Sequence, residues 1–249
     1  MSNPHPRRVR ADLLLVERGL FESRARAQAA IAAGLVTADG TVLRKASETV
    51  PYTAAITAEA PHPYVSRGGV KLAAALDTFG FDPAGQACLD VGASTGGFSD
   101  VLLRRGAAHV HAVDVGQSQL HDSLRGDPRL TSLEQQDIRT LDPALMPVRP
   151  ALAVIDVSFI SLKLVLPAVA SLLAPAAGLV ALIKPQFEAR RSALKKGVLR
   201  DAALQAQICD EIAALVGELG FAVLGTIPSP IEGGDGNREF LIGATRRQG

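Results

Sequence analysis

Residues 87–100 read Ala-Cys-Leu-Asp-Val-Gly-Ala-Ser-Thr-Gly-Gly-Phe-Ser-Asp, and this stretch decides the fold. Its apolar start is typical of a buried strand, and a helix is expected from Phe98 onward. Gly92, Gly96 and Gly97 allow the backbone between them to turn tightly and to approach a ligand closely. A helix N-terminus that follows such a turn offers free N–H groups. The stretch therefore predicts a strand, a ligand-binding loop and a helix in succession.

The ligand is indicated by the spacing of the glycines and by two acidic residues. Gly-x-x-x-Gly-Gly differs from the Gly-x-Gly-x-x-Gly pattern of dinucleotide-binding loops. Asp90, ahead of the first glycine, suits a cationic amino-acid tail better than a pyrophosphate. Asp114 closes the next predicted strand, where a carboxylate can hold both hydroxyls of a ribose. The combination indicates S-adenosylmethionine (SAM), and a purely structural βα turn is the alternative for the loop alone.

Eight residues form the predicted SAM site. They are Asp90, Gly92, Ser94, Gly96, Gly97, Phe98, Asp114 and Asp137. The last of them follows the third predicted strand and is a candidate to face the adenine amine. A helix cap is an equally good interpretation of that aspartate.

From about residue 65 the chain alternates between strand and helix patterns, which predicts a parallel sheet with helices on both faces. Strands are expected at 87–91, 109–114, 130–134, 152–157, 179–184, 221–227 and 238–244. Helices are expected at 68–78, 98–105, 117–124, 161–173 and 202–219. The last two strands are joined by a loop too short for a helical crossover, so they should form an antiparallel hairpin at the sheet edge.

The first 60 residues predict a separate small α+β domain. Helices are expected at 11–18 and 24–33, each followed by a glycine. Asp39-Gly40 between two β-prone runs predicts a hairpin. Residues 61–66, with two prolines, are the expected linker, and residues 67–249 form the larger domain.

Composition limits the function classes. The 249 residues carry a formal net charge of only +1, so a site for nucleic acid must be a local basic patch. The two cysteines, Cys88 and Cys209, fit buried free thiols of a reducing compartment and do not have metal-ligand spacing. No secretory signal follows the basic N-terminus, so we expect a cytoplasmic protein. The uncharged stretch 164–183 is long enough to span a bilayer, but its prolines favour a helix, a turn and a buried strand.

Ionisable residues stand where predicted strands end, which is the ligand-binding edge of an open α/β sheet. Asp156 and Lys184 end two apolar strands, Lys71 lies on the first helix of the larger domain, and Glu239 lies in the final hairpin. Neighbouring charge and partial burial can lower the pKa of a lysine enough for it to act as a base. A structural Lys–Asp ion pair is the alternative.

These motifs resemble the TlyA family of ribosomal RNA 2′-O-methyltransferases, often called hemolysin A. The resemblance covers nearly the whole chain: the first domain resembles the S4 RNA-binding fold, and the second resembles FtsJ-like methyltransferases. Its most specific motifs are residues 66–72, 90–97, 156–162, 184–188 and 236–239. It implies a Lys-Asp-Lys-Glu catalytic tetrad, which falls on Lys71, Asp156, Lys184 and Glu239. It also implies a Rossmann-like, SAM-dependent methyltransferase fold with a seven-stranded sheet, no metal, and ribosomal RNA or ribosomal subunits as partners.

Most of the basic residues that would contact RNA lie in two regions, the S4-like domain and the loop after the fifth strand, and Arg67 stands at the start of the larger domain. The predicted contacts are Arg8, Arg10, Arg24, Arg26, Arg44, Lys45, Arg67, Arg190, Arg191, Lys195 and Lys196. A solvated charge run is the alternative for the loop.

Three other functions compete with an RNA methyltransferase. A membrane-active hemolysin would need residues 164–183 or an amphipathic helix to enter lipid. A catalytically inactive S4 module that only senses SAM would have no use for the tetrad. A small-molecule methyltransferase would leave the first domain without a purpose. The family resemblance implies a cytidine of large-subunit ribosomal RNA as the target, with the small subunit as a further source. The residues themselves specify neither the methylated nucleotide nor the oligomeric state.

Overall fold

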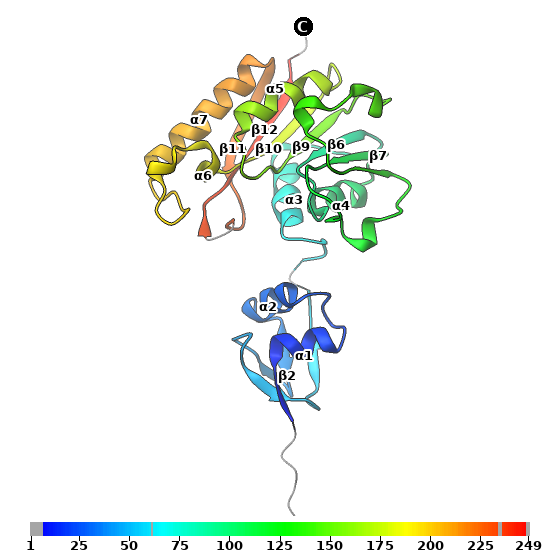
Figure 1. Cartoon of the computed structure of the whole chain (residues 1–249), viewed down its shortest axis with the longest axis vertical. Coiled ribbons are helices and arrows are strands. Elements are labelled where there is room, and N and C mark those ends of the chain that lie inside the picture. Colours follow the sequence, from blue (N-terminus) through cyan, green and yellow to red (C-terminus); the bar gives the residue numbers. More distant parts are fainter. Residues whose placement is uncertain (1–6, 61, 234–235, 248–249) are drawn as a thin grey trace, which may run out of the picture. The chain divides into compact units, whose positions relative to one another are not determined.

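The structure is a computed structural model that describes residues 7–60, 62–233 and 236–247. The chain divides into two compact units, residues 1–63 and 64–249 (Figure 1). Residues 64–66, which are expected in the linker, lie within the second unit.

The first unit packs two helices against short strands. Its core gathers Leu14 and Leu15 from the first helix, Ile31 from the second, and Val36 and Val50 from the strands. The elements are β1 (Arg8–Arg10), α1 (Ala11–Glu17), α2 (Arg24–Ala32), β2 (Val36–Ala38), β3 (Thr41–Val42), β4 (Thr49–Pro51) and β5 (Ile56–Ala58).

The predicted hairpin of the first unit is confirmed. β2 pairs antiparallel with β3, and Ala38 lies opposite Thr41. Asp39 and Gly40, between the two strands, both have positive φ, at 49° and 77°. This is the left-handed geometry that tight hairpin turns require, and aspartate and glycine tolerate it best.

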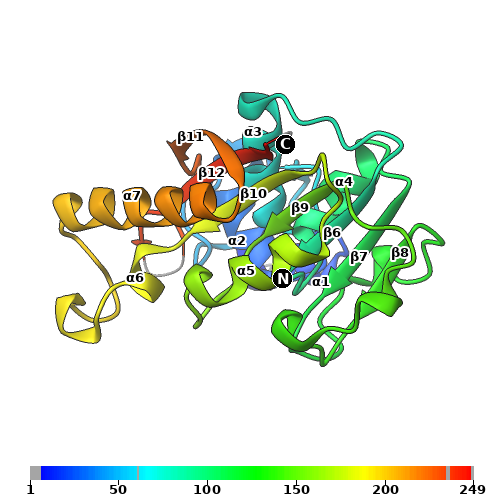
Figure 2. The same ribbon diagram turned by 90° about the horizontal axis from the view of Figure 1, so that it is seen from above.

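The second unit is a seven-stranded mixed sheet in the order β11-β12-β10-β9-β6-β7-β8 (Figure 2). Its strands are β6 (Ala87–Val91), β7 (His109–Val113), β8 (Leu130–Leu133), β9 (Leu152–Ile155), β10 (Gly178–Ile183), β11 (Phe221–Pro228) and β12 (Phe240–Arg246). Its α-helices are α3 (Gly68–Phe79), α4 (Gly97–Arg104), α5 (Leu162–Leu172), α6 (Pro185–Glu188) and α7 (Ala202–Glu218). β12 runs antiparallel to both β10 and β11, so the predicted fold class and terminal hairpin are confirmed.

Alternate residues of the central strands enter two separate cores. On β10, Leu179, Ala181 and Ile183 pack with α5 and α7, whereas Val180 and Leu182 pack with α3 and α4. Every residue of β10 is buried, as expected for a strand that is covered on both faces. Residues 164–183 are thus divided between a helix and a strand. Among the described residues, no helix is both long and apolar enough to cross a membrane.

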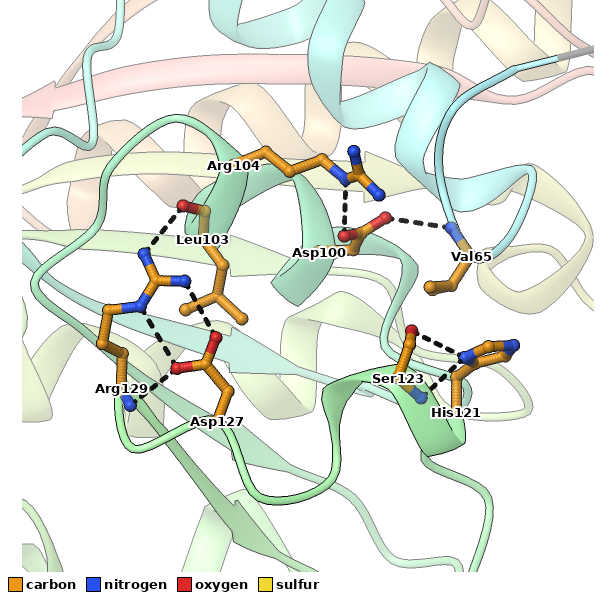
Figure 3. Close-up of polar contacts among 8 residues, drawn as sticks. All are labelled: Val65, Asp100, Leu103, Arg104, His121, Ser123, Asp127 and Arg129. Atoms are coloured by element: carbon orange, nitrogen blue, oxygen red, sulfur yellow. Dashed lines mark hydrogen bonds and ion pairs between the residues drawn. The ribbon is translucent and has the colours of Figure 1, made fainter.

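The helix predicted at 117–124 is wrong. Only a short 3₁₀ turn forms there, at Asp122–Leu124. Side chains compete with the helix for its backbone donors: His121 Nδ1 accepts from the Ser123 amide, as Figure 3 shows, and the Ser118 amide donates to Glu134. Ser118 also has a positive φ of 55°, which a helix does not allow.

Candidate active site

The glycine loop that follows β6 is shaped mainly by close contacts with the protein itself. Gly92 and Gly96 have φ values of 83° and 88°, in the left-handed region. A Cβ on Gly92 would overlap the Asp156 carbonyl oxygen, and one on Gly96 would overlap Leu124. The structure therefore gives these two glycines a reason within the protein itself: neither the backbone conformation nor the space beside it admits a side chain.

Asp90 lies at the end of β6 and is fully buried. Ser99 Oγ donates to its Oδ2 at 2.7 Å, while Oδ1 has no hydrogen-bond partner among the described residues. The pKa of this carboxyl group is raised to about 7, mainly by burial and also by the nearby carboxylates of Asp156 and Asp114, while the bonds from Ser99 oppose the increase. An unpartnered buried carboxylate next to two others is a place where a cationic ligand would be stabilised.

Asp114 follows β7 and is oriented by two backbone amides. Its Oδ2 accepts from Ser94 N at 2.8 Å, and its Oδ1 accepts from Gly116 N at 2.6 Å. Both oxygens keep a lone pair for the hydroxyls of a ribose. The unpartnered oxygen of Asp90 and the oriented carboxylate of Asp114 thus fit the ammonium and the ribose of SAM at the two ends of the glycine loop.

The segment before α3 is attached to the start of α4. The Val65 amide donates to Asp100 Oδ2 at 2.9 Å, and Arg104 Nε donates to Asp100 Oδ1 at 2.7 Å (Figure 3). A Cβ on Gly97 would overlap Ser66 Oγ. Residues 65 and 66 therefore pack against the end of the glycine loop and the start of α4, which explains why they belong to the second unit.

Lys184 and Asp156 meet at the ends of β10 and β9. Lys184 Nζ lies 2.6 Å from Asp156 Oδ1 and donates to Ser158 Oγ at 2.8 Å. The contact with Asp156 is an ion pair without hydrogen-bond alignment. The side chains are 11% and 21% exposed, so the pair is reachable by a substrate but largely shielded from water.

Lys71 and Glu239 form a second pair, which is more deeply buried. Lys71 Nζ on α3 donates to Glu239 Oε2 at 2.5 Å, and the two side chains are 10% and 3% exposed. These residues are 168 positions apart in the sequence.

The register of the sheet brings the two ion pairs together. Ile183 of β10 pairs with Phe240 of β12, so Lys184, which follows Ile183, leaves the sheet beside Glu239, which precedes Phe240. The Asp156 carbonyl oxygen lies so close to Gly92 of the glycine loop that a Cβ on this glycine would overlap it. The structure thus places all four residues of the proposed tetrad at one edge of the sheet, next to the predicted SAM site.

Asp137 serves as a cap in the structure. Its carboxylate accepts from the Arg139 amide at 2.9 Å and pairs with the Arg139 guanidinium at 2.5 Å. These contacts lower the pKa of Asp137, the side-chain bond from Arg139 being the main cause. Its role toward the adenine stays a prediction.

The arginines of the first unit differ in their partners. Arg10 and Arg24 both bind the buried carboxylate of Asp12, at 3.0 and 2.9 Å. The pKa of Asp12 is far below its usual range, mainly because of the hydrogen bond from Arg10. The other predicted RNA contacts of the first unit do not bind Asp12. Arg8 bonds Thr49, and Arg26 pairs with Glu22 at 3.8 Å. Arg44 and Lys45 are exposed.

The predicted contacts of the second unit lie on the surface. Arg67 is exposed immediately before α3. Arg190 and Arg191, and Lys195 and Lys196, are likewise exposed in the segment after α6.

The structure adds an aromatic pair that the sequence analysis did not single out. Phe159 is 90% exposed and has a positive φ of 64°, which is rare for a bulky residue. Its ring lies 5.0 Å from that of Phe187, and Lys184 Nζ lies 6.0 Å from the Phe187 ring. The sequence signal that could have indicated Phe159 is its position three residues after Asp156, at the ligand-binding end of a predicted strand.

Glu188 links helix α6, which carries Phe187, to the segment that follows Phe159. Its carboxylate accepts from Ser161 Oγ and, at 2.7 Å, from the Leu162 amide at the start of α5. Glu188 lies in the motif 184–188, but the sequence gives no sign that it caps α5, because that contact exists only in the folded chain.

Comparison with known proteins identifies the domains and the relatives. Residues 64–246 match the FtsJ-like methyltransferase family, and residues 9–51 match the S4 domain. The chain is 45% identical over 239 residues to the 16S/23S rRNA (cytidine-2′-O)-methyltransferase TlyA of Mycobacterium tuberculosis, covering 95% of this chain and 89% of that protein. It is 38% identical over 235 residues to Hemolysin A of Brachyspira hyodysenteriae, covering 94% and 98%. A solved structure with a hemolysin name, from Streptococcus thermophilus, matches with a TM-score of 0.76 and 41% identity, covering 97% of this chain and 89% of that one.

The second unit is therefore a SAM-dependent methyltransferase, and it is preceded by an S4 domain. More narrowly, the chain belongs to the FtsJ-like methyltransferase family and, within it, to the TlyA family that its motifs resemble.

Proposed function

We propose that this enzyme transfers a methyl group from SAM to a ribose 2′-hydroxyl of ribosomal RNA, with a cytidine as the target. The observation that carries the proposal is the meeting of Lys184–Asp156 and Lys71–Glu239 beside the glycine loop. The TlyA relative is named for cytidine-2′-O-methylation of 16S and 23S rRNA, which favours both subunits as sources of substrate. A ribosomal RNA substrate supports a cytoplasmic location for the enzyme.

Lys184 is the residue that we expect to activate the hydroxyl. A neutral hydroxyl is a poor nucleophile, so it needs a base or a strong orienting acceptor, and its proton must leave as the O–CH3 bond forms and the S–CH3 bond breaks. Asp156 and Ser158 hold Lys184 Nζ at 2.6 and 2.8 Å, which fixes its direction. Lys71 and Glu239 would position the hydroxyl and balance the charge around it. Bound SAM supplies an electrophilic methyl group on a sulfonium, so much of the acceleration comes from alignment of the hydroxyl.

The exposed aromatic ring beside Lys184 suits a nucleic-acid substrate. Single-stranded bases are commonly recognised by stacking on aromatic side chains. Phe159 offers an almost fully exposed ring close to the proposed base, and Phe187 supports it. A base that stacks on Phe159 would bring its own ribose toward Lys184.

The experiment is transfer of labelled methyl groups from SAM to isolated ribosomal subunits and to naked ribosomal RNA. A 2′-O-methyl group blocks alkaline cleavage at its own nucleotide, so the product should survive as an alkali-resistant dinucleotide containing the label. Lys184→Ala should fold, bind SAM and lose at least about 100-fold in rate. Label on a base, or substantial activity of Lys184→Ala, would refute the proposal.

A further inference from the structure

The segment between α6 and α7 carries an ordered group of cations. Its five basic residues are exposed. They are Arg190, Arg191, Lys195, Lys196 and Arg200. Within the described part of the chain, none of their side chains pairs with a carboxylate. Cations that are left unpaired in this way are available for phosphates.

The two lysines stand on a tight turn. Lys195 N donates to Val198 O at 3.0 Å, and Val198 N donates back to Lys195 O at 3.1 Å. Lys196 and Gly197, at the tip, have φ values of 52° and 80°. A lysine held in the left-handed region is uncommon, so the surroundings must fix this turn. We call residues 195–198 the lysine turn.

Asn237 supplies much of that support. Its side-chain Nδ2 donates to Gly197 O at 3.3 Å, and its Oδ1 accepts from Leu199 N at 3.3 Å. Gln205 holds the other side of Leu199, donating to its carbonyl at 2.7 Å. Asn237 is 4% exposed and Gln205 is 3% exposed. Asn237 therefore holds the lysine turn itself, at Gly197, whereas Gln205 holds only Leu199, the residue that follows the turn.

Asn237 also belongs to the segment that presents Glu239. The Asn237 carbonyl accepts from Gly233 N at 2.9 Å, and a Cβ on Gly233 would overlap the Glu239 carboxylate. Asn237 thus contacts the lysine turn through its side chain. Through its backbone it holds Gly233, which lies against the Glu239 carboxylate. Figure 1 shows the loop after α6 and the end of the β11–β12 hairpin at the same end of the sheet.

We propose that Asn237 is a positioning residue that locks the lysine turn to the Glu239 segment. An RNA phosphate that binds Lys195 and Lys196 then sets how the substrate ribose meets the Lys71–Glu239 pair. Asparagine suits the role because it combines a donor for Gly197 O and an acceptor for Leu199 N in one short side chain. This inference rests on the proposed RNA methyltransferase activity and assigns a further residue to it.

The test compares Asn237→Ala with Gln205→Ala at saturating SAM and varied RNA. Asn237→Ala should lower kcat roughly 10-fold to 100-fold, since small misplacements of reacting groups have effects of that size. Its Kd for SAM should stay within about twofold of the wild type. Gln205→Ala removes a buried hydrogen bond at Leu199, next to the lysine turn but outside it, and does not touch the Glu239 segment. It should therefore affect at most the KM for RNA and leave kcat within about twofold.

A double-mutant cycle tests the link directly. Lys195→Ala/Lys196→Ala is combined with Asn237→Ala, and coupling requires that the two losses in kcat do not multiply. Losses that multiply, or an equal fall in kcat for Gln205→Ala, would overturn the inference. If Asn237→Ala does not fold, Asn237→Asp keeps the shape and the Oδ1 acceptor but lacks the donor to Gly197 O. A normal kcat for that variant would also overturn it. Failure of the wild type to methylate RNA would refute the proposed function instead.

Discussion

Replacing Asp90 with asparagine is expected to make the stability of the protein less dependent on pH. Burial raises the pKa of this carboxyl group to about 7 in the folded protein, from 3.8. Between these two values the folded state keeps a proton that the unfolded state has lost. The free energy of unfolding therefore falls as pH rises from about 4 to about 7, and is level above that. The Asp90→Asn variant has no ionisable group at this position and should not show this fall.

The size of the effect follows from the shift. One pKa unit corresponds to about 1.4 kcal/mol, so between about pH 5.5 and about pH 8.5 the wild type should lose about 2 kcal/mol relative to Asp90→Asn. Urea unfolding at the two pH values measures this difference, provided that the m-value is unchanged. Asparagine can still accept the hydrogen bond from Ser99, so the local geometry is kept.

Asp77→Asn is the matched control. A hydrogen bond from Arg105 lowers the pKa of Asp77, so this carboxylate is ionised in both folded and unfolded protein throughout the same pH range. Its effect on stability should be constant between the two pH values. A constant difference for Asp90→Asn as well would refute the assignment of a raised pKa to Asp90. SAM should bind Asp90→Asn about 10-fold to 100-fold more weakly at high pH, because a charged hydrogen bond is lost.

Three further perturbations test other parts of the site. Glu239→Gln leaves the buried ammonium of Lys71 without its counter-charge, so urea unfolding should reveal a loss of about 3 kcal/mol; an unchanged midpoint would mean that the pair is not buried as described. Gly97→Ala should weaken SAM binding in calorimetry because its Cβ overlaps Ser66 Oγ, and Ser66→Ala in the same chain should restore it; no rescue would point to another cause. Phe159→Ala should lower kcat/KM for RNA about 5-fold to 150-fold through lost stacking, with the Kd for SAM unchanged; equal loss of SAM binding would argue against stacking.

Local sequence patterns predicted the sheet well because its strands are buried in a simple way. β9 and β10 are continuous apolar runs, and each ends immediately before a charged residue, Asp156 and Lys184 respectively. The prediction at 117–124 failed because polar side chains there bond to nearby amides, and such local competition has no hydrophobic period.

The pairing within the site depends on tertiary structure. Lys71 meets Glu239 only because α3 packs against the sheet and β12 is inserted between β10 and β11. The family resemblance named these residues, whereas spacing along the chain could not show which lysine pairs with which carboxylate. Phe159 likewise becomes informative only when the fold leaves its ring exposed.

The arginines of the first unit show how structural and RNA-binding roles overlap in one side chain. A guanidinium has five N–H donors, and Arg10 uses two of them on Asp12, at 3.0 Å each. The donors that remain are held in a fixed direction and stay available to a phosphate. A loss of RNA binding in an Arg10 variant therefore has two causes, a missing phosphate contact and a buried Asp12 carboxylate that keeps only Arg24 as its counter-charge. The two can be separated only when the stability of the first unit is measured alongside the affinity, since the second cause alone also lowers stability.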